Sequence, residues 1–128
     1  MTALLAGSVV VATPVLARAE GYAGIWDVSG TIQSGGPVVL NIAAVCIFQQ
    51  AGELISGTCQ APEAIGPATG TVDGRGISWQ ADVRPTAPNG ASGAFAFAGT
   101  LGPDNVIRGE VKYSGMPGRV GAFTAQRP

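Results

Sequence analysis

Apolar and polar residues alternate along most of the chain, in short blocks separated by turn-forming residues. The clearest block covers residues 77–84, where Ile77, Trp79, Ala81 and Val83 alternate with polar side chains. A period of two places successive side chains on opposite faces of a β-strand. Turn signals recur about every 8 to 12 residues, a spacing typical of β-sandwiches and β-barrels. No segment has a convincing helical period, so the pattern predicts an all-β protein.

Eight strands are predicted from these blocks. They cover residues 24–33, 38–50, 54–59, 68–72, 77–84, 95–100, 107–113 and 119–126, with longer loops at 60–67 and 84–92. Neighbouring strands are joined by short connections, and no helix is predicted that could cover an open sheet. Closing such an antiparallel meander removes its exposed edges. We therefore expect an up-and-down β-barrel of about eight strands, with a two-sheet sandwich as the alternative.

The two cysteines lie symmetrically about a predicted hairpin turn at Gly52-Glu53. Glycine at the first loop position suits a type II′ turn. The resulting register places Cys46 opposite Cys59 at a non-hydrogen-bonded position, where Cα atoms lie about 4.5 Å apart, and Phe48 opposite Gly57. The chain has no Cys-x-x-Cys motif and no His. This arrangement favours a structural disulfide over a redox or metal-binding pair.

The first residues are typical of an export signal. The apolar run at residues 4–16 is too short to span a bilayer, and Ala17-Arg18-Ala19 has the small-x-small form of a cleavage site. We expect a signal peptide over residues 1–19, one domain over 20–128 and a periplasmic or secreted location, where disulfides persist. No Lys or Arg precedes the apolar run, which leaves open a longer natural leader that begins before Met1. A first core strand or an anchoring helix is the alternative to an export signal. No membrane span is expected after signal removal.

Composition excludes several classes of function. The net charge of −1 provides no basic stripe for nucleic acid. Only 12% of residues are charged, and weakly charged, Ala-rich surfaces leave self-association open. Without His there is no Ser-His or Cys-His nucleophile and none of the usual zinc sites. We expect no metal and no cofactor, and we assign no catalytic residue.

Four aromatic residues are the candidates for ligand binding: Trp26, Trp79, Phe97 and Tyr113. Such rings can stack on a small apolar ligand inside a barrel, or they can simply fill the core. The first functional hypothesis is a carrier of such a ligand. The second is an interaction or inhibitor module that acts through the loops at 60–67 and 84–92. The third is a cofactor-free isomerase or cyclase of hydrophobic substrates, in which Tyr113 or Glu110 moves a proton.

The order of several motifs over residues 24–127 resembles that of the avidin and lipocalin group of small barrels. These motifs are Gly24-Ile25-Trp26, the 52–58 segment Gly-Glu-Leu-Ile-Ser-Gly-Thr, Ile77-Ser78-Trp79, Phe97-Ala98-Gly99 and Ala122-Phe123-Thr124. The resemblance implies a calycin-type exported bacterial barrel with a ligand-sized mouth. It does not extend to biotin binding. Where avidins carry an Asn and two ligand-contacting Trp residues, this chain has Val28, Val83 and Val111.

Overall fold

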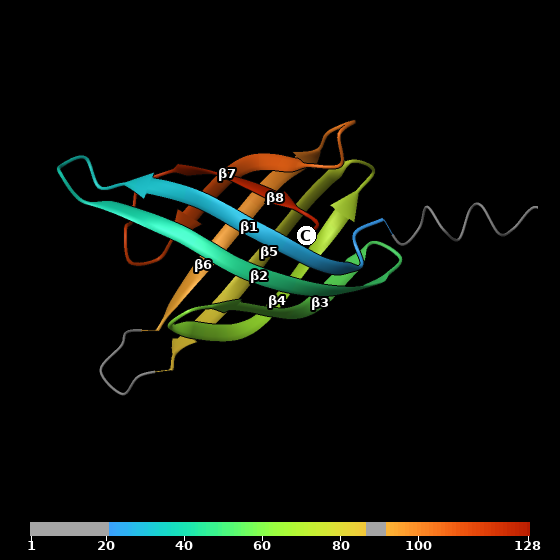
Figure 1. Cartoon of the computed structure of the whole chain (residues 1–128), viewed down its shortest axis with the longest axis horizontal. Coiled ribbons are helices and arrows are strands. Elements are labelled where there is room, and N and C mark those ends of the chain that lie inside the picture. The colour runs from blue at the N-terminus through green and yellow to red at the C-terminus, as the bar shows by residue number, and fades with distance from the viewer. Residues whose placement is uncertain (1–20, 87–91) are drawn as a thin grey trace, which may run out of the picture.

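The computed structural model describes residues 21–86 and 92–128, and these form a closed antiparallel barrel in which each strand pairs with its sequence neighbours (Figure 1). Pairing of β1 with β8 closes the ring. The predicted barrel is therefore confirmed, and the sandwich alternative is wrong. The predicted signal peptide lies outside the described residues. The strands are β1 (Gly24–Gln33), β2 (Val39–Ala51), β3 (Leu54–Ala61), β4 (Ala64–Asp73), β5 (Gly76–Pro85), β6 (Gly93–Leu101), β7 (Ile107–Tyr113) and β8 (Gly121–Gln126).

The alternation read from the sequence decides which side chains enter the barrel. In β5, Ile77, Trp79 and Ala81 are buried while the residues between them are exposed. The same period places Trp26 and Val28 of β1 inside. Because a one-residue slip would exchange the two faces of a strand, burial of one apolar face holds the register.

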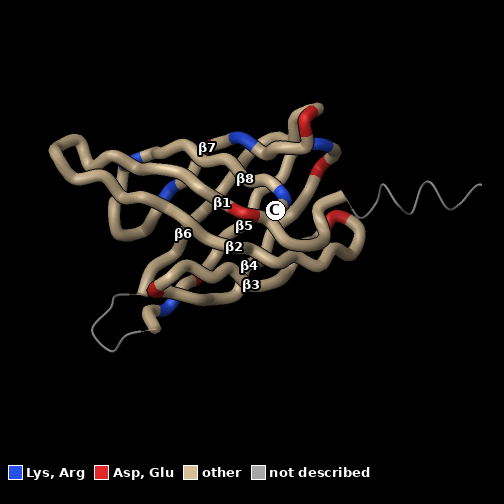
Figure 2. The backbone as a smooth tube through the Cα atoms, viewed as in Figure 1, with Lys and Arg blue, Asp and Glu red and all other residues tan. Residues whose placement is uncertain are grey.

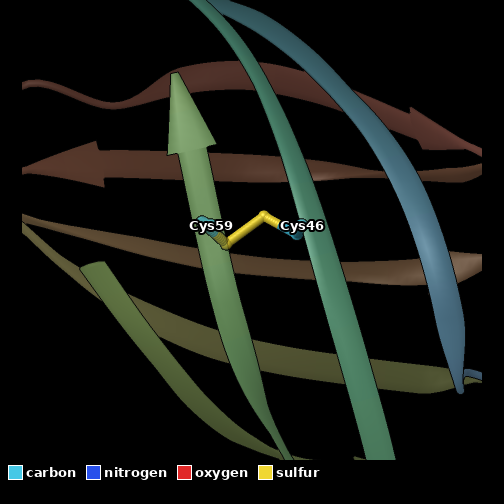
Figure 3. Close-up of a disulfide and its surroundings, with 2 residues drawn as sticks. All are labelled: Cys46 and Cys59. Carbon is cyan, nitrogen blue, oxygen red and sulfur yellow. A yellow bond between two sulfur atoms is a disulfide. The ribbon is translucent and has the colours of Figure 1, made fainter. Parts of the chain in front are cut away.

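The β2–β3 hairpin forms as predicted. Gly52 opens the turn with a φ of 64°, a conformation that glycine adopts without steric cost. Cys46 lies opposite Cys59, and their sulfurs form a disulfide with the two Cα atoms 4.0 Å apart (Figure 3). Phe48 pairs with Gly57, as the register required. The hairpin and its disulfide are thus confirmed.

The predicted loop at residues 60–67 is wrong. β3 continues to Ala61, and only Pro62 and Glu63 separate it from β4. Proline normally argues against a strand interior because it cannot donate a hydrogen bond. Here Pro67 lies within β4, at a point where the β4–β5 ladder lacks pairs but resumes on both sides. The pairs of β4 with β3 and β5 on either side of Pro67 hold the strand together despite the missing donor. A prediction from one strand's sequence does not contain these pairs.

The second predicted loop, at 84–92, is also shorter than expected at its start, because β5 runs through Pro85. Residues 87–91 lie outside the described part of the chain. β6 begins earlier than predicted, at Gly93, and β8 begins later, at Gly121. These shifts change the strand boundaries and leave the topology unaltered.

One end of the barrel is closed by a plug around Trp26. Its indole Nε1 donates to the Tyr22 carbonyl at 2.9 Å, and the Tyr22 hydroxyl donates to the Gly74 carbonyl at 3.2 Å. Burial raises the pKa of the Tyr22 hydroxyl. The Arg127 guanidinium lies 4.3 Å from the Trp26 ring centroid and donates to the carbonyls of Gly21 and Ala23. Arg127, after β8, thereby holds residues 21–23, before β1, in place across the barrel end.

Candidate functional site

The opposite end of the barrel contains an apolar cavity of about 420 Å³. This volume lies within the range of small-molecule sites, about 300 to 1,000 Å³. Its walls come from the first half of β2, from the end of β3 with the β3–β4 turn, and from β5 and β6. The apolar side chains that line it include Leu40, Ile42, Ala44, Ala81, Val83, Phe95 and Phe97.

The cavity exists because small residues face each other across this side of the barrel. Ala81 is buried at 2% exposure and is paired with Phe95, and Ala44 points inward from β2. Ile32 and Ile107, which do not line the cavity, are fully buried and fill other parts of the interior. An eight-stranded barrel is just wide enough for side chains to fill it. Alanine at inward positions therefore leaves space that larger side chains would occupy.

A series of aromatic rings runs from the cavity rim toward the barrel centre. Tyr113 stacks on Phe95, with 4.4 Å between the ring centroids, and Phe95 lies 6.3 Å from Phe97. Phe97 in turn stacks on Trp79 at 4.7 Å. Offset stacked rings at such separations attract one another beyond simple area burial. The series forms a continuous aromatic wall, with Trp79 packed beneath the cavity-lining Phe97.

Trp79 differs from Trp26 in its hydrogen bonding. Both indoles are buried, at 3% and 1% exposure. The Nε1 of Trp26 donates to a backbone carbonyl, but that of Trp79 has no acceptor within residues 21–86 and 92–128. The ring is held instead by edge-to-face contacts with Phe48 and Phe123 at 5.3 and 5.4 Å. A buried, unused donor therefore lies within the aromatic cluster next to the cavity.

The structure brings three of the four predicted ligand residues to one region. Phe97 lines the cavity, whereas Trp79 and Tyr113 contact its aromatic lining. Trp26 belongs to the plug at the other end. Sequence reasoning missed Phe95, although it shares the alternation of Phe97. It also missed the inward alanines, because a methyl side chain carries no chemical signal of a site.

Charged groups contribute little to the cavity. Glu63, in the β3–β4 turn, is the one charged residue among the described cavity-lining residues. Glu110 is exposed on the outer face of β7. The described residues hold no group of three or more His, Cys, Asp and Glu placed to bind a metal ion. A proton-transfer role for Tyr113 or Glu110 stays a prediction, and Glu110 would have to act outside the cavity.

The ion pair between Asp104 and Arg108 lies near the β6–β7 turn, with 2.8 Å between its closest atoms. Hydrogen bonds from the Arg108 guanidinium lower the pKa of the Asp104 carboxyl to about 2. This pair stabilises a turn and does not border the cavity.

Comparison with known proteins leaves the site to be interpreted from its geometry. The chain matches no known protein-family model, and no curated protein is found to be related to it in sequence. Within the described ranges, no helix has the length and apolar character needed to cross a membrane.

Proposed function

We propose that this protein binds a small, predominantly apolar ligand in the cavity at the open end of its barrel. The observation that carries the proposal is the apolar cavity of about 420 Å³ beside the aromatic series that ends at Trp79. Burying apolar ligand surface there is favourable by roughly 25 cal/mol per Å². The limited charge of the lining argues for a neutral ligand body, because an ion would lose its hydration without gaining a partner.

The location proposed for this activity is the periplasm or the medium. The Cys46–Cys59 disulfide is typical of oxidising compartments, and the apolar N-terminal run is typical of an export signal. The closed eight-stranded barrel is consistent with the calycin-type resemblance of the motifs. Membership of an avidin-like or lipocalin-like group is part of the proposal.

A fluorescence titration tests ligand binding directly. The neutral apolar fluorophore N-phenyl-1-naphthylamine is titrated into the protein, and its emission is followed together with tryptophan quenching. Trp79 lies beneath the cavity lining and Trp26 lies in the plug. We therefore expect saturable binding, with quenching retained in the Trp26→Phe variant and largely lost in the Trp79→Phe variant.

A cavity-filling substitution supplies the matched control. Ala44→Leu places a larger side chain in the cavity and should weaken probe binding at least tenfold. Ala96→Leu makes the same chemical change on the exposed outer face of β6 and should leave binding unchanged. Absence of saturable binding, or equal affinities for both variants, would contradict the proposed function.

A further inference from the structure

β2 is longer than its neighbour β3 at the open end. It pairs with β1 from Val39 through Phe48, but it pairs with β3 only from Val45 to Ala51. β3 turns back at Pro62. In Figure 1, β2 and its connection to β1 project at the left beyond the turn that joins β3 to β4. Within the described part of the chain, residues 39–44 therefore have a strand partner on one side only.

The hydrogen-bond phase of β2 shows which backbone groups face the free side. The Cα separation of 4.0 Å marks Cys46 and Cys59 as a non-hydrogen-bonded pair. The next pair, Val45 with Gln60, is then hydrogen-bonded, so odd-numbered residues of β2 direct their N–H and C=O groups toward β3. Within residues 21–86 and 92–128, the N–H and C=O groups that face this side with no strand opposite them are those of Val39, Asn41 and Ala43.

The cavity lies directly behind this free edge. Leu40, Ile42 and Ala44, which alternate with the edge residues, line the cavity. Ala43 and Pro62 border both the cavity and a groove on the outer surface. Among the described residues no strand lies on this side of residues 39–44 of β2, and a strand placed there would direct alternate side chains into the cavity.

The edge lacks the usual protection against strand addition. Exposed edges commonly carry charged residues or proline, but β2 contains neither along its whole length (Figure 2). Glu63 is the one charged side chain of the described residues that borders the cavity. The charge of the site therefore favours a neutral or basic occupant over an acidic one.

We propose that the occupant of this cavity is an extended peptide that adds to β2 as a strand. It runs antiparallel to β2 in line with β3, pairs with residues 39–43, and places alternate apolar side chains beside Phe95 and Phe97. Backbone pairing supplies affinity and the cavity supplies side-chain selection, as in other cases of strand addition. This inference rests on the proposed function, because the peptide side chains are the apolar ligand of the same cavity.

The experiment measures fluorescence anisotropy of a labelled peptide of five alternating Val and Thr residues, with acetylated and amidated ends. We expect saturable binding that displaces N-phenyl-1-naphthylamine. The same peptide with N-methylated Thr residues keeps its side chains but loses backbone donors, and we expect it to bind at least tenfold more weakly. Replacing the Val residues by Asp should also abolish binding.

A protein variant tests the edge itself. Ala43→Pro removes an N–H that faces the free side, and it leaves the β1–β2 hydrogen bonds in place because those involve even-numbered residues of β2. We expect at least a tenfold loss of peptide affinity and an unchanged urea midpoint. Ala43 borders the cavity but its side chain is exposed, so the affinity for N-phenyl-1-naphthylamine should change far less than the peptide affinity. If this variant does not fold, the N-methylated peptide tests the same hydrogen bonds on the wild-type protein.

The outcomes separate the two proposals. If the probe binds but the peptide does not, the peptide inference is overturned and the proposed function stands. If neither binds, both fall. If the peptide binds but tolerates N-methylation, strand addition is overturned. If sedimentation shows a wild-type dimer and an Ala43→Pro monomer, a second copy of the chain occupies the edge and the peptide proposal is overturned.

Discussion

Removing the disulfide with the paired substitutions Cys46→Ala and Cys59→Ala should cost a large part of the stability of the barrel. The bond joins residues separated by 13 positions, and closing a loop of about that length lowers the entropy of the unfolded chain by an amount worth about 3 kcal/mol at 25 °C. Both cysteine residues are also buried, at 1% and 3% exposure, and line the cavity, so removal of their sulfurs enlarges it. The total stability of a domain is about 5 to 15 kcal/mol.

Urea unfolding followed by tryptophan fluorescence measures this effect. We expect the double variant to unfold at a lower urea midpoint, with a free energy of unfolding about 3 kcal/mol below that of the oxidised wild type. Its thermal midpoint should fall by more than about 10 °C, because each kcal/mol corresponds to roughly 4 to 8 °C in a domain of this size. A reducing agent present during unfolding should move the wild-type midpoint toward that of the variant.

The reducing agent should leave the variant itself unchanged, which serves as the control. Equal urea midpoints for the oxidised wild type and the double variant would refute the argument that the disulfide stabilises the protein by constraining its unfolded chain. A changed slope with urea concentration would instead show that the compactness of the unfolded state had changed.

Three further predictions concern the plug, the β6–β7 turn and the β2–β3 hairpin. Arg127→Ala should lower the free energy of unfolding by about 1 to 2 kcal/mol, because two hydrogen bonds and a cation–π contact are lost, whereas thermal unfolding with no shift would show that the plug does not need it. The Asp104 carboxyl should titrate in ¹³C NMR at about pH 2. Because this pKa is lowered in the folded protein, the ionised Asp104 stabilises the fold above the ordinary carboxyl pKa, and this contribution is lost as the pH falls toward 2. Arg108→Gln should raise the titration midpoint of Asp104. Gly57→Ala should destabilise by at least about 2 kcal/mol, because its Cβ would overlap the backbone oxygen of Ile47 in β2. Gly52→Asn should cost less than Gly57→Ala, because Asn is among the residues found at positive φ in primed turns and no atom of the described residues lies within 4 Å of an added Cβ. Equal urea midpoints for these two glycine variants would contradict the close approach of the β2 backbone to Gly57.

Local patterns predicted most of the fold correctly. The alternation around Trp79 identified β5 and its buried face, and the positions of Cys46 and Cys59 about Gly52 identified the hairpin register. These features depend on neighbours in the chain or on one turn, so a single sequence contains them. Pro67 was misread for the same reason, because a proline is judged locally although β4 is held by strands on both of its sides.

The candidate site depends on the combined size of side chains that are far apart in the sequence, which no local pattern contains. The cavity arises because Ala44 and Ala81, far apart in sequence, face the same interior space, and only closure of the barrel brings them together. The residues predicted to bind ligand divide between the two ends for the same reason: Phe97 reaches the cavity while Trp26 lies in the plug.

Alternating polarity and two well-placed cysteines are sufficient to determine strands, their faces and one hairpin, because each acts over a short stretch of chain. Only the tertiary structure decided how far β2 extends past β3, and hence that backbone groups near Asn41 have no strand opposite them within the described residues. Strand pairing and interior volume are properties of segments that meet in space. Strand pairing and interior volume are therefore determined only when the whole ring of strands has closed.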